Sequence, residues 1–562
     1  MPKSNDSILR RHPLPFVFLT VIICLMPILT QRDFTPMNEL RYLSIADEMI
    51  ENDHIFILTN HGEPYADKPP LYIWLIILLK KLAGGHSIFL LSMLGLIPAF
   101  ITVAVLDKWI FVNDKKNALD RAAMALMLCS SGLFLTLSFY FRMDMMMTMF
   151  IVLALYSFHL MYSGRGNFKL QSWLLPLWIF LAIFTKGPVG LLMPVLVIVV
   201  FLLMGKEAKE LGKYLGIKTL GVIASLCALW FLGVIAEHGG KEYLYDLTVH
   251  QTFGRAVNSF HHNEPIYYYL KNIWLTIFPY SILIFPVLSA GLPSPRKMKT
   301  GEKSDDEKIF LISFWGTFLM LCIISSKHIL YLMPLVPFAI YGFYLTVKRM
   351  GWRKWMNILL SITAGLICLT AVALIIVFRA DSIPALHKIL SGYPFLQSNF
   401  TTVALVMMLI GGAMSLIILF WKRQWQKSII WLALGWLLAV YSASFQMNQI
   451  NDIIGYGNFC KAIPENTNVA AINVRRPENI DVYIHREIAK DYAKDTTAFK
   501  NDLANGTLQK PVTLIVSDKM LRKGFLGWCE RNGSMIDCHG PYALVFFGNE
   551  QNEAPPASEN PS

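Results

Sequence analysis

The feature that most constrains this chain is a series of long apolar stretches across its first 446 residues. The first covers residues 14–30, and the later ones cover residues 87–106, 118–137, 145–162, 172–185, 188–204, 217–236, 269–290, 309–325, 329–347, 356–378, 400–420 and 428–446. A stretch of roughly 17 to 25 apolar residues can cross the hydrocarbon core of a bilayer as a helix. The sequence therefore predicts a mainly α, polytopic membrane domain over residues 1–446, with about thirteen transmembrane helices.

The composition excludes an ordinary soluble enzyme. Of the 562 residues, 55% are hydrophobic and only 16% are charged, whereas a soluble domain has roughly 25% charged residues. The formal net charge of +12 would suit nucleic-acid binding if the basic residues were gathered on one segment. They stand instead in short clusters between the apolar stretches, a pattern typical of membrane loops. We therefore expect membrane lipids, and no nucleic acid, among the partners.

The distribution of these basic clusters predicts the orientation of the chain. With the N-terminus in the cytoplasm, the clusters near residues 108–116, 206–218, 296–303, 348–354 and 422–427 all fall on the cytoplasmic side, as the positive-inside rule requires. We interpret residues 14–30 as a retained span rather than a cleaved signal sequence, because no small-x-small cleavage site precedes Gln31. An odd number of spans then places the C-terminal region on the outer side.

The composition changes at about residue 447, where polar residues alternate with short β-branched runs at 469–472, 512–516 and 544–547. This pattern predicts a small α/β domain over residues 447–550 outside the membrane. Residues 551–562, rich in Pro, Asn, Ser and Glu, are expected to be a disordered tail. In an oxidising compartment Cys529 and Cys538 could pair, although Cys460 allows other pairings.

The outer face carries two long loops, residues 31–86 and 237–268, and several isolated charges at the ends of spans. Arg142, Asp144, Lys186 and Lys327 lie at short outer junctions. Charges at membrane depth are costly unless they face a cavity or a partner, so they mark a functional site by default. The alternative is that each is an interfacial anchor, and their concentration on one face argues against that alternative.

Two outer segments have residue types that suit anions and metals. In the first loop, Asp67 and Lys68 precede two prolines, which fix the backbone before an expected helix over residues 71–79. A lysine there suits a phosphate and an aspartate suits a cation. In the second loop, His250 could bind a divalent metal together with a carboxylate, and Arg255 could bind a phosphate.

Taken together, the outer motifs resemble those of a known family. They are Asn38-Glu39-x-Arg41-Tyr42, Tyr65-Ala66-Asp67-Lys68-Pro69-Pro70-Leu71, Arg142-x-Asp144, Thr185-Lys186-Gly187-Pro188, and Ser326-Lys327 with Tyr331-Leu332-x-Pro334. In this order they resemble the bacterial aminoarabinose transferases and the wider protein mannosyltransferase superfamily, over about residues 14 to 350. The resemblance implies a GT-C type membrane glycosyltransferase in the bacterial inner membrane, with its active site and C-terminal domain in the periplasm.

The resemblance also implies the substrates. The donor would be a polyprenyl (undecaprenyl) phosphate carrying 4-amino-4-deoxy-L-arabinose or a related sugar, and the acceptor a phosphate of lipid A or another periplasmic acceptor. No nucleotide cofactor is expected. A divalent metal in a zinc-like site is expected.

Carried over residue by residue, the family pattern assigns a role to each candidate. Lys68 would hold the donor phosphate with Tyr65 and Arg255, and Asp67 and His250 would hold the metal. Asp144 would line the sugar or acceptor pocket and, with Asn38 and Glu39, form the catalytic set. The remaining candidates for substrate or phosphate binding are Arg41, Arg142, Lys186, Lys327 and Tyr331.

Two positions depart from the family pattern. Asn38 stands where the family has Asp, and Asp67 stands where it has Glu. An amide cannot act as a general base, which favours an acceptor that is already anionic, such as a phosphate. The alternatives are a protein O-glycosyltransferase, which would need Glu39 or Asp144 as its base, and a lipid-linked sugar transporter or flippase. A transporter should carry ionisable positions near the bilayer midplane, whereas here they gather at one face.

Overall fold

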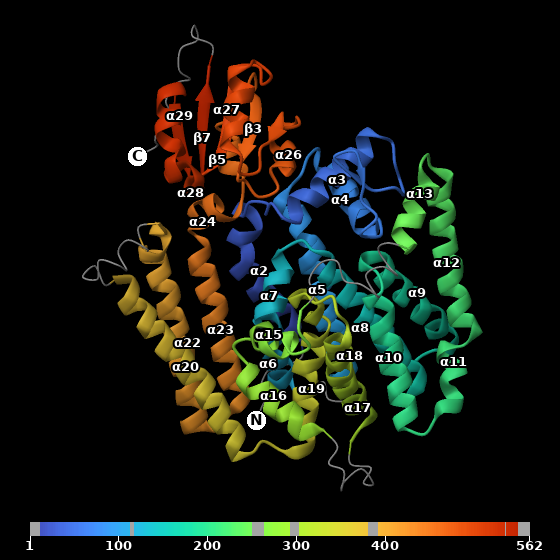
Figure 1. The fold of residues 1–562 in the computed structure, drawn as a ribbon. Helices are drawn as coiled ribbons and strands as arrows, with labels where there is room; N and C mark the ends of the chain where they lie inside the picture. Colours follow the sequence, from blue (N-terminus) through green and yellow to red (C-terminus); the bar gives the residue numbers. More distant parts are fainter. Residues whose placement is uncertain are drawn as a thin grey trace.

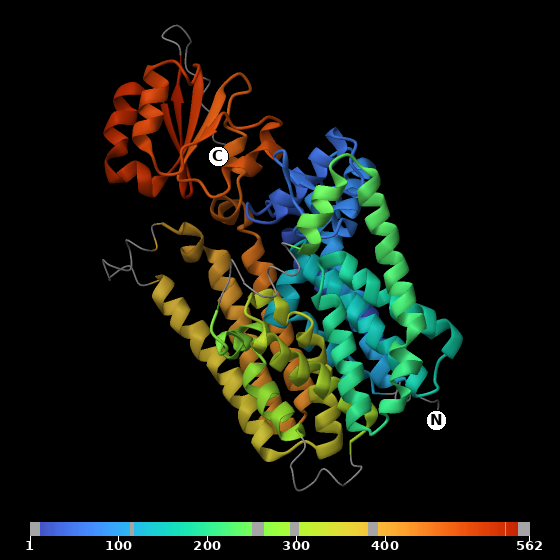
Figure 2. The same cartoon turned by 45° about the vertical axis from the view of Figure 1, so that its right-hand side comes forward.

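The protein consists of a helical membrane domain with a small α/β domain at one end (Figures 1 and 2). The structure, a computed structural model, describes residues 12–112, 117–249, 264–292, 303–379, 390, 392–533 and 535–548. The expected disordered tail and the positions of His250 and Arg255 lie outside these residues. The end of the membrane domain that carries the α/β domain is referred to below as the outer end.

Long apolar helices make up most of the membrane domain. In the described part of the chain, nine helical segments are long and apolar enough to cross a membrane: Pro13–Gln31, Ile88–Phe111, Met143–Tyr162, Phe168–Lys186, Ala208–Ala236, Ile329–Met350, Lys354–Arg379, Asn399–Lys422 and Trp425–Ser444. They contain, in order, α2, α5, α8, α9, α12 (Ile217–Ala236), α19 (Leu335–Met350), α20, α22 and α23. The chain is therefore a multi-pass membrane protein.

Four further apolar stretches fold differently from the straight spans that the sequence predicts. α6 (Ala118–Cys129) with α7 (Gly132–Phe139) is bent by 71°, and α15 (Tyr268–Thr276) with α16 (Ser281–Gly291) by 118°. α10 (Val189–Met204) is shorter, and a π-turn, η3 (Ile312–Gly316), separates α17 (Asp305–Leu311) from α18 (Thr317–Ile323). Each of the thirteen apolar stretches thus forms helix, while the number of complete spans is nine to eleven by length and composition over the described residues.

The two bent pairs meet at their bends. The backbone N–H of Gly132 donates to the carbonyl of Phe278 over 2.8 Å, and the hydroxyls of Ser130 and Tyr280 are 2.7 Å apart in a buried hydrogen bond. A Cβ on Gly132 would come within 2.8 Å of the carbonyl oxygen of Leu275. At each bend, polar groups that the broken helix leaves without a partner form hydrogen bonds to the other bent pair. This pairing allows non-helical backbone inside an apolar domain.

Two short helices of the first loop lie over the outer end of the membrane domain. α3 (Glu39–Glu51) and α4 (Leu71–Ala83) pack against one another, with the two-stranded hairpin β1 (Thr59–Asn60) and β2 (Glu63–Pro64) between them in the chain. The sequence predicted α4, over residues 71–79, and the structure confirms it. α13 (Gly240–Tyr245) follows α12 at the same end (Figure 1).

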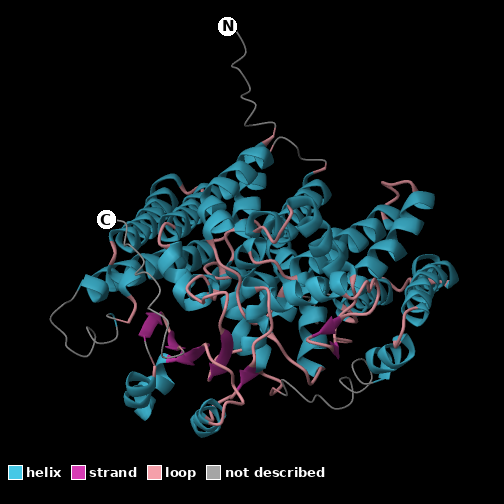
Figure 3. Ribbon diagram, turned by 90° about the horizontal axis from the view of Figure 1, so that it is seen from above, coloured by secondary structure: helices cyan, strands magenta, loops and turns pink. Residues whose placement is uncertain are grey.

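The C-terminal domain contains a five-stranded sheet in the order β4-β3-β5-β7-β6. The strands are β3 (Asn468–Ile472), β4 (Lys490–Asp491), β5 (Val512–Ser517), β6 (Met535–His539) and β7 (Tyr542–Phe547). β3 runs parallel to β4 and β5, and β7 runs antiparallel to β5 and β6. Figure 3 shows the strands beside a molecule that is otherwise almost entirely helical.

The two faces of this sheet have different partners. One face packs with Phe499 of α27 (Thr496–Ala504) and Cys529 of α29 (Leu526–Asn532) in a core of its own. The other face, through residues such as Ile515 and Leu544, joins the main core of the membrane domain. Of the pairings that the sequence left open, Cys529–Cys538 does not form: Cys529 is buried on its helix, Cys538 is exposed on β6, and both are free thiols.

Short elements connect the sheet to the last span. α24 (Met447–Ile454) and α25 (Gly457–Cys460) precede the sheet, and η6 (Pro477–Ile480) with α26 (Asp481–Ile484) follows β3. These elements face the first loop, next to the outer end of α2 (Figure 2). The loop that carries the predicted site therefore lies between the membrane helices and the C-terminal domain.

Candidate active site

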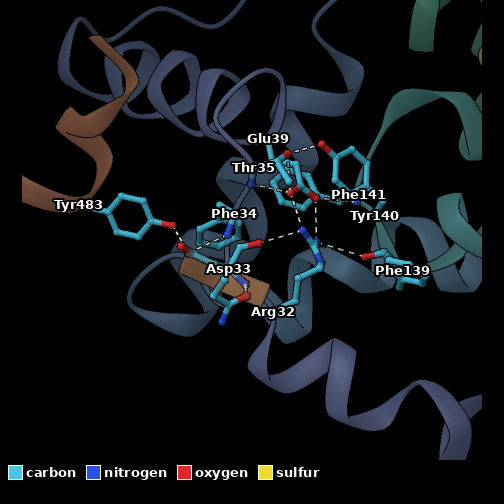
Figure 4. Close-up of polar contacts among 10 residues, drawn as sticks. Arg32, Asp33, Phe34, Thr35, Glu39, Phe139, Tyr140, Phe141 and Tyr483 are labelled. Atoms are coloured by element: carbon cyan, nitrogen blue, oxygen red, sulfur yellow. Dashed lines mark hydrogen bonds and ion pairs between the residues drawn. The ribbon is translucent and has the colours of Figure 1, made fainter. Parts of the chain in front are cut away.

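The first predicted residue of the site, Glu39, is completely buried at the start of α3. Its carboxylate pairs with Arg32 through two hydrogen bonds, of 2.5 Å from Nη1 and 2.8 Å from Nη2. It also accepts from the backbone N–H and the hydroxyl of Thr35, over 2.9 and 3.0 Å, and from the backbone N–H of Phe141 over 3.1 Å. Figure 4 shows these groups around the carboxylate. Such a bidentate, charge-assisted pair fixes both position and orientation.

Glu39 therefore connects the first loop to the junction between α7 and α8. Arg32, which is only 4% exposed, also donates to the carbonyl of Phe139 over 3.3 Å, and its guanidinium lies 5.2 Å from the ring centre of Tyr140. Burial raises the pKa of Tyr140 to about 12, with the charge of Glu39 acting in the same direction. Because both carboxylate oxygens are occupied, the geometry suits Glu39 to holding the loop rather than to taking a proton.

A second buried group of charges lies at the outer ends of α8 and α9. The carboxylate of Asp144, in the first turn of α8, binds the ammonium of Lys186, the last residue of α9. It also accepts from Nε of Arg142 over 3.2 Å. Asp144 is 1% exposed. We call Arg142, Asp144 and Lys186 the buried charge cluster, and its formal charge is positive because two cations face one carboxylate.

Backbone geometry at the end of α9 places Lys186 in this cluster. α9 stops at Gly187, whose φ of 105° lies in the region that favours glycine. The chain then turns directly into α10, and a Cβ on Gly190 would overlap the backbone of Ala182. Lys186 is thus held between two closely packed helices instead of extending into solvent.

Tyrosines surround the buried charge cluster. The ammonium of Lys186 lies 4.7 Å from the ring centre of Tyr331, as expected for a cation–π contact. Tyr42 of α3 and Tyr72 of α4 are buried, with ring centres 6.1 Å apart. Burial raises the pKa of Tyr42 despite the opposing charge of Arg142. Both phenols therefore stay protonated and can donate hydrogen bonds beside the cluster.

The structure brings further predicted residues to the same place. The pKa of the Tyr42 hydroxyl is shifted by electrostatic interactions with Arg41, Tyr65, Arg142 and Asp144. All four residues therefore lie near Tyr42. Arg41 and Asn38 are half-buried on α3, and neither side chain makes a hydrogen bond or ion pair among the residues that the structure describes.

Tyr65, Asp67 and Lys68 lie in the turn that leads into α4. The hydroxyl of Tyr243, on α13, donates to the carbonyl of Tyr65 over 3.2 Å. Burial is the main cause of the raised pKa of Tyr243, and the charge of Asp67 adds to it. α13 thus closes this turn from the side of α12, and it brings the start of the second loop against the Lys-Pro-Pro segment.

Lys327 has a different environment from the other predicted cations. It is 4% exposed, and its ammonium donates to the backbone carbonyl of Glu264 over 2.9 Å. The next residue, His328, accepts at Nδ1 from the N–H of Leu330 over 3.2 Å, at the start of the short helix that carries Tyr331. Lys327 therefore holds the end of the second loop beside Tyr331.

The metal expectation stays a proposal. His250 lies outside the described residues, and within them no group of three or more His, Cys, Asp or Glu side chains could hold a metal ion. Asp67 is a suitable oxygen ligand, but no step of the reaction below is assigned to a metal. Arg255 also lies outside the described residues.

The sequence did not predict a role in the site for two residues of this region, Arg32 and Tyr72. Arg32 was visible only as a charge after the first span, and its pairing with Glu39 depends on the turn between α2 and α3. Tyr72 looked like one aromatic residue of an apolar helix, although its hydroxyl is buried without a hydrogen bond among the described residues. A search for polar atoms on the buried face of α4 would have found it.

Comparison with known proteins agrees with this fold. Residues 67–248 match the dolichyl-phosphate-mannose-protein mannosyltransferase family. The undecaprenyl phosphate-alpha-4-amino-4-deoxy-L-arabinose arabinosyl transferase of Pectobacterium atrosepticum is 25% identical over 375 residues, which cover 64% of this chain and 65% of the relative. The transferase of the same name from Pseudomonas aeruginosa PAO1 is 28% identical over 351 residues, 60% of each chain. The chain thus spans somewhat less than two thirds of these relatives.

Two solved structures share the fold over almost the whole chain. They are crystal structures of ArnT from Cupriavidus metallidurans, one bound to undecaprenyl phosphate and one in the apo state. Each has a TM-score of 0.70 and covers 95% of this chain and 97% of its own, at 18% and 17% identity.

The chain has the fold of these GT-C type membrane proteins, and about a third of it matches the protein mannosyltransferase family. It is similar in sequence to the aminoarabinose transferases.

Proposed function

We propose that this protein transfers a sugar from a polyprenyl phosphate to a phosphate group of a lipid acceptor at the periplasmic face of the bacterial inner membrane. The donor is undecaprenyl phosphate carrying 4-amino-4-deoxy-L-arabinose or a related sugar, and the acceptor is lipid A. The N-terminus lies in the cytoplasm, and the C-terminal domain lies in the periplasm. The names of the relatives support the donor and the sugar.

The observation that carries the proposal is the buried charge cluster at the outer end of the membrane domain. Arg142 and Lys186 place two cations around the single carboxylate of Asp144, and Arg41 adds a half-buried guanidinium on α3. Buried charge is retained only where it is paired or has a ligand. A site with excess positive charge is suited to lipid phosphates.

The reaction follows from this electrostatic arrangement. An oxygen of the acceptor phosphate attacks the anomeric carbon of the sugar, and the bond between that carbon and the donor phosphate oxygen breaks. The electron pair stays on the polyprenyl phosphate, which gains negative charge as it leaves. Lys68, with Arg255, stabilises this charge, and a cation placed in advance in a low-dielectric site does so without reorganisation.

The state of the carboxylates favours a phosphate acceptor over a protein hydroxyl. A serine or threonine acceptor needs a general base within hydrogen-bond reach. Glu39 is occupied by Arg32, Thr35 and Phe141, and both oxygens of Asp144 face cations. A phosphate is already anionic at neutral pH and needs neither group as a base.

The test compares lipid A and periplasmic glycoproteins, by mass spectrometry, from cells with and without this protein. The proposal expects a sugar-sized mass on lipid A that depends on the protein, and its loss when Lys68 is replaced by Ala. The same mass on glycopeptides would identify a protein O-glycosyltransferase instead. Lipids and glycopeptides that do not depend on the protein would contradict both enzymes and favour a lipid-linked sugar transporter.

A further inference from the structure

The carboxylate of Asp33 joins the first loop to the C-terminal domain. It accepts from the backbone N–H of Gly457 over 2.6 Å and from the hydroxyl of Tyr483. The backbone N–H of Asp33 donates to the side chain of Asn451 over 2.9 Å. All three partners belong to segments that follow the last span, and Figure 4 shows Tyr483 reaching the loop from the opposite side to Arg32.

The C-terminal domain is shaped to receive this carboxylate. A Cβ placed on Gly455 or on Gly457 would overlap the side chain of Asp33, so glycine at both positions permits the close approach. The ring of Tyr483 also packs on Phe34, with ring centres 6.4 Å apart. Asp33 therefore occupies a fitted recess and is not a surface charge with a chance partner.

Asp33 is adjacent in the chain to the residue that holds Glu39. Arg32 donates to the carbonyl of Asp33 over 3.0 Å while it pairs with the Glu39 carboxylate. Glu39 in turn accepts from Phe141, the residue before Arg142. A continuous set of short contacts thus runs from the C-terminal domain to the buried charge cluster.

Two more contacts dock the same domain on the same loop. The side-chain amide of Asn479 donates to the carbonyl of Pro36 over 2.9 Å, two residues before Asn38. The hydroxyl of Ser44, on α3, donates to Asp481 over 2.8 Å. The domain therefore contacts both the turn before α3 and the helix itself.

We propose that Asp33 is a positioning residue for the transfer reaction. Docking of the C-terminal domain on its carboxylate, through Gly457 and Tyr483, holds the loop that carries Asn38 and Arg41 over the buried charge cluster. This inference rests on the proposed function for the reaction that it serves, but the docking itself rests only on the contacts above.

The test uses the full-length protein and the variant Tyr483→Phe, which removes one hydrogen bond and keeps the ring on Phe34. Tyr492→Phe is the matched control, because the hydroxyl of Tyr492 donates to the carboxylate of Asp502 over 2.8 Å within the same domain and away from the loop. Asp33→Asn is a second variant at the contact, since an amide has only one acceptor oxygen and cannot accept from both Gly457 and Tyr483. The first readout is amide hydrogen exchange of the peptide that covers residues 34–42.

We expect this peptide to exchange about three- to tenfold faster in Tyr483→Phe and Asp33→Asn than in the wild-type protein, the range for loss of one hydrogen bond of ordinary net strength when the other docking contacts remain. Tyr492→Phe should leave its exchange unchanged. Equal exchange in all four proteins would overturn the proposal.

The second readout is the kinetics of transfer. If docking stabilises the loop position that binds the acceptor, the variants populate this position less often, and a saturating acceptor concentration restores it. In Tyr483→Phe and Asp33→Asn, KM for the acceptor should therefore rise about three- to tenfold while kcat stays within about twofold of wild type. A fall in kcat at constant KM would indicate only a smaller active fraction and would overturn the positioning role. Absence of transfer by the wild-type protein would overturn the proposed function instead, and hydrogen exchange would still decide whether Asp33 holds the loop.

Discussion

The ammonium group of Lys186, at the end of α9, binds the carboxylate of Asp144, in the first turn of α8, and both side chains are at most 9% exposed. Forty-two residues separate them in the chain. Their meeting turns two isolated charges at membrane junctions into one buried pair. Arg142 adds a second cation to it, so the pair lies at the centre of the site.

Removing Lys186 separates the structural from the functional role of this pair. Lys186→Met removes one of the two cations from the Asp144 carboxylate and leaves Arg142 as its partner, so the loss of stability should be about 1.5–3 kcal/mol, the contribution of one hydrogen bond to a charged group. The double variant Asp144→Asn with Lys186→Met leaves Arg142 without its carboxylate, so it should be less stable still, and it should remain inactive. Thermal unfolding in detergent and the transfer rate measure the two effects. Activity in the double variant would show that the pair is only structural.

Lys68 is predicted to act on the donor phosphate. Lys68→Ala should lower kcat/KM at least about 100-fold, the usual effect of losing one stabilising group for developing negative charge. The control is Lys81→Ala, which removes an exposed lysine from the end of α4 and should leave the rate unchanged. Transfer rates of the purified proteins, with their unfolding temperatures, provide the measurement. A rate for Lys68→Ala within a few-fold of wild type would remove this residue from the phosphate site.

Glu39 is predicted to act through Arg32 rather than as a base. Arg32→Gln and Glu39→Gln each leave the other side chain buried with an incomplete partner, so both should destabilise the protein by about 3–5 kcal/mol and lower the rate to a similar extent. A general base contributes about 100-fold or more. If the transfer rate fell about 100-fold in Glu39→Gln only, while Arg32→Gln was equally unstable but active, Glu39 would be a general base.

Asn38 tests the nature of the acceptor. It lies at the N-cap of α3, and its side chain makes no hydrogen bond to the first turn. An aspartate fits there, and its negative charge interacts favourably with the helix dipole. For a phosphate acceptor, Asn38→Asp should change the transfer rate by less than about threefold, because no base is needed. Measured rates with a lipid acceptor decide this. A large gain in rate would indicate that the acceptor must be deprotonated.

Asp47 should make the stability of the first loop depend on pH. Burial raises the pKa of its carboxyl, but hydrogen bonds and charge from His86 and Lys80, at 2.7 and 2.6 Å, outweigh burial and lower it. A carboxyl with a lowered folded-state pKa stabilises the protein above its unfolded pKa, about 3.9, and this contribution is lost as the pH falls through the folded-state value.

Asp47→Asn should therefore lower the free energy of unfolding by about 1–2 kcal/mol near neutral pH. The difference from wild type should shrink as the pH falls from about 3.9 through the lowered folded-state pKa, below which the carboxyl is protonated in both states. Thermal unfolding in detergent across this range provides the measurement. A difference that does not vary with pH would mean that Asp47 acts through its packing and not its charge.

Most helices and strands of this protein can be predicted from local sequence patterns. Apolar runs of membrane length predict the helices, because a backbone in lipid must satisfy its own hydrogen bonds. Local signals also predicted α4 and the central strands of the C-terminal sheet, since periodicity and proline position act within a few residues. The edge strands β4 and β6 were missed, because a strand of two residues and one with mixed burial carry little pattern.

Which charged side chains contact one another depends on how the helices pack. The residues of the motifs were visible, yet nothing local states that Lys186 pairs with Asp144 or that Arg32 occupies both oxygens of Glu39. The bends at Gly132 and Phe278, which replace two straight spans, also depend on partners far away in the chain. Such pairings are set by how the helices pack. Burying an unpaired charge or backbone group costs free energy, so the packing arrangements that pair these groups are favoured.

The longest of these relationships joins Asp33 to Tyr483 across 450 residues. Composition separated the C-terminal domain from the membrane domain, but it could not show that this domain lies on the first loop. A docking contact between a carboxylate, two glycines and a tyrosine has no periodicity to detect. It exists because the folded surfaces fit, and that fit is a property of the tertiary structure alone.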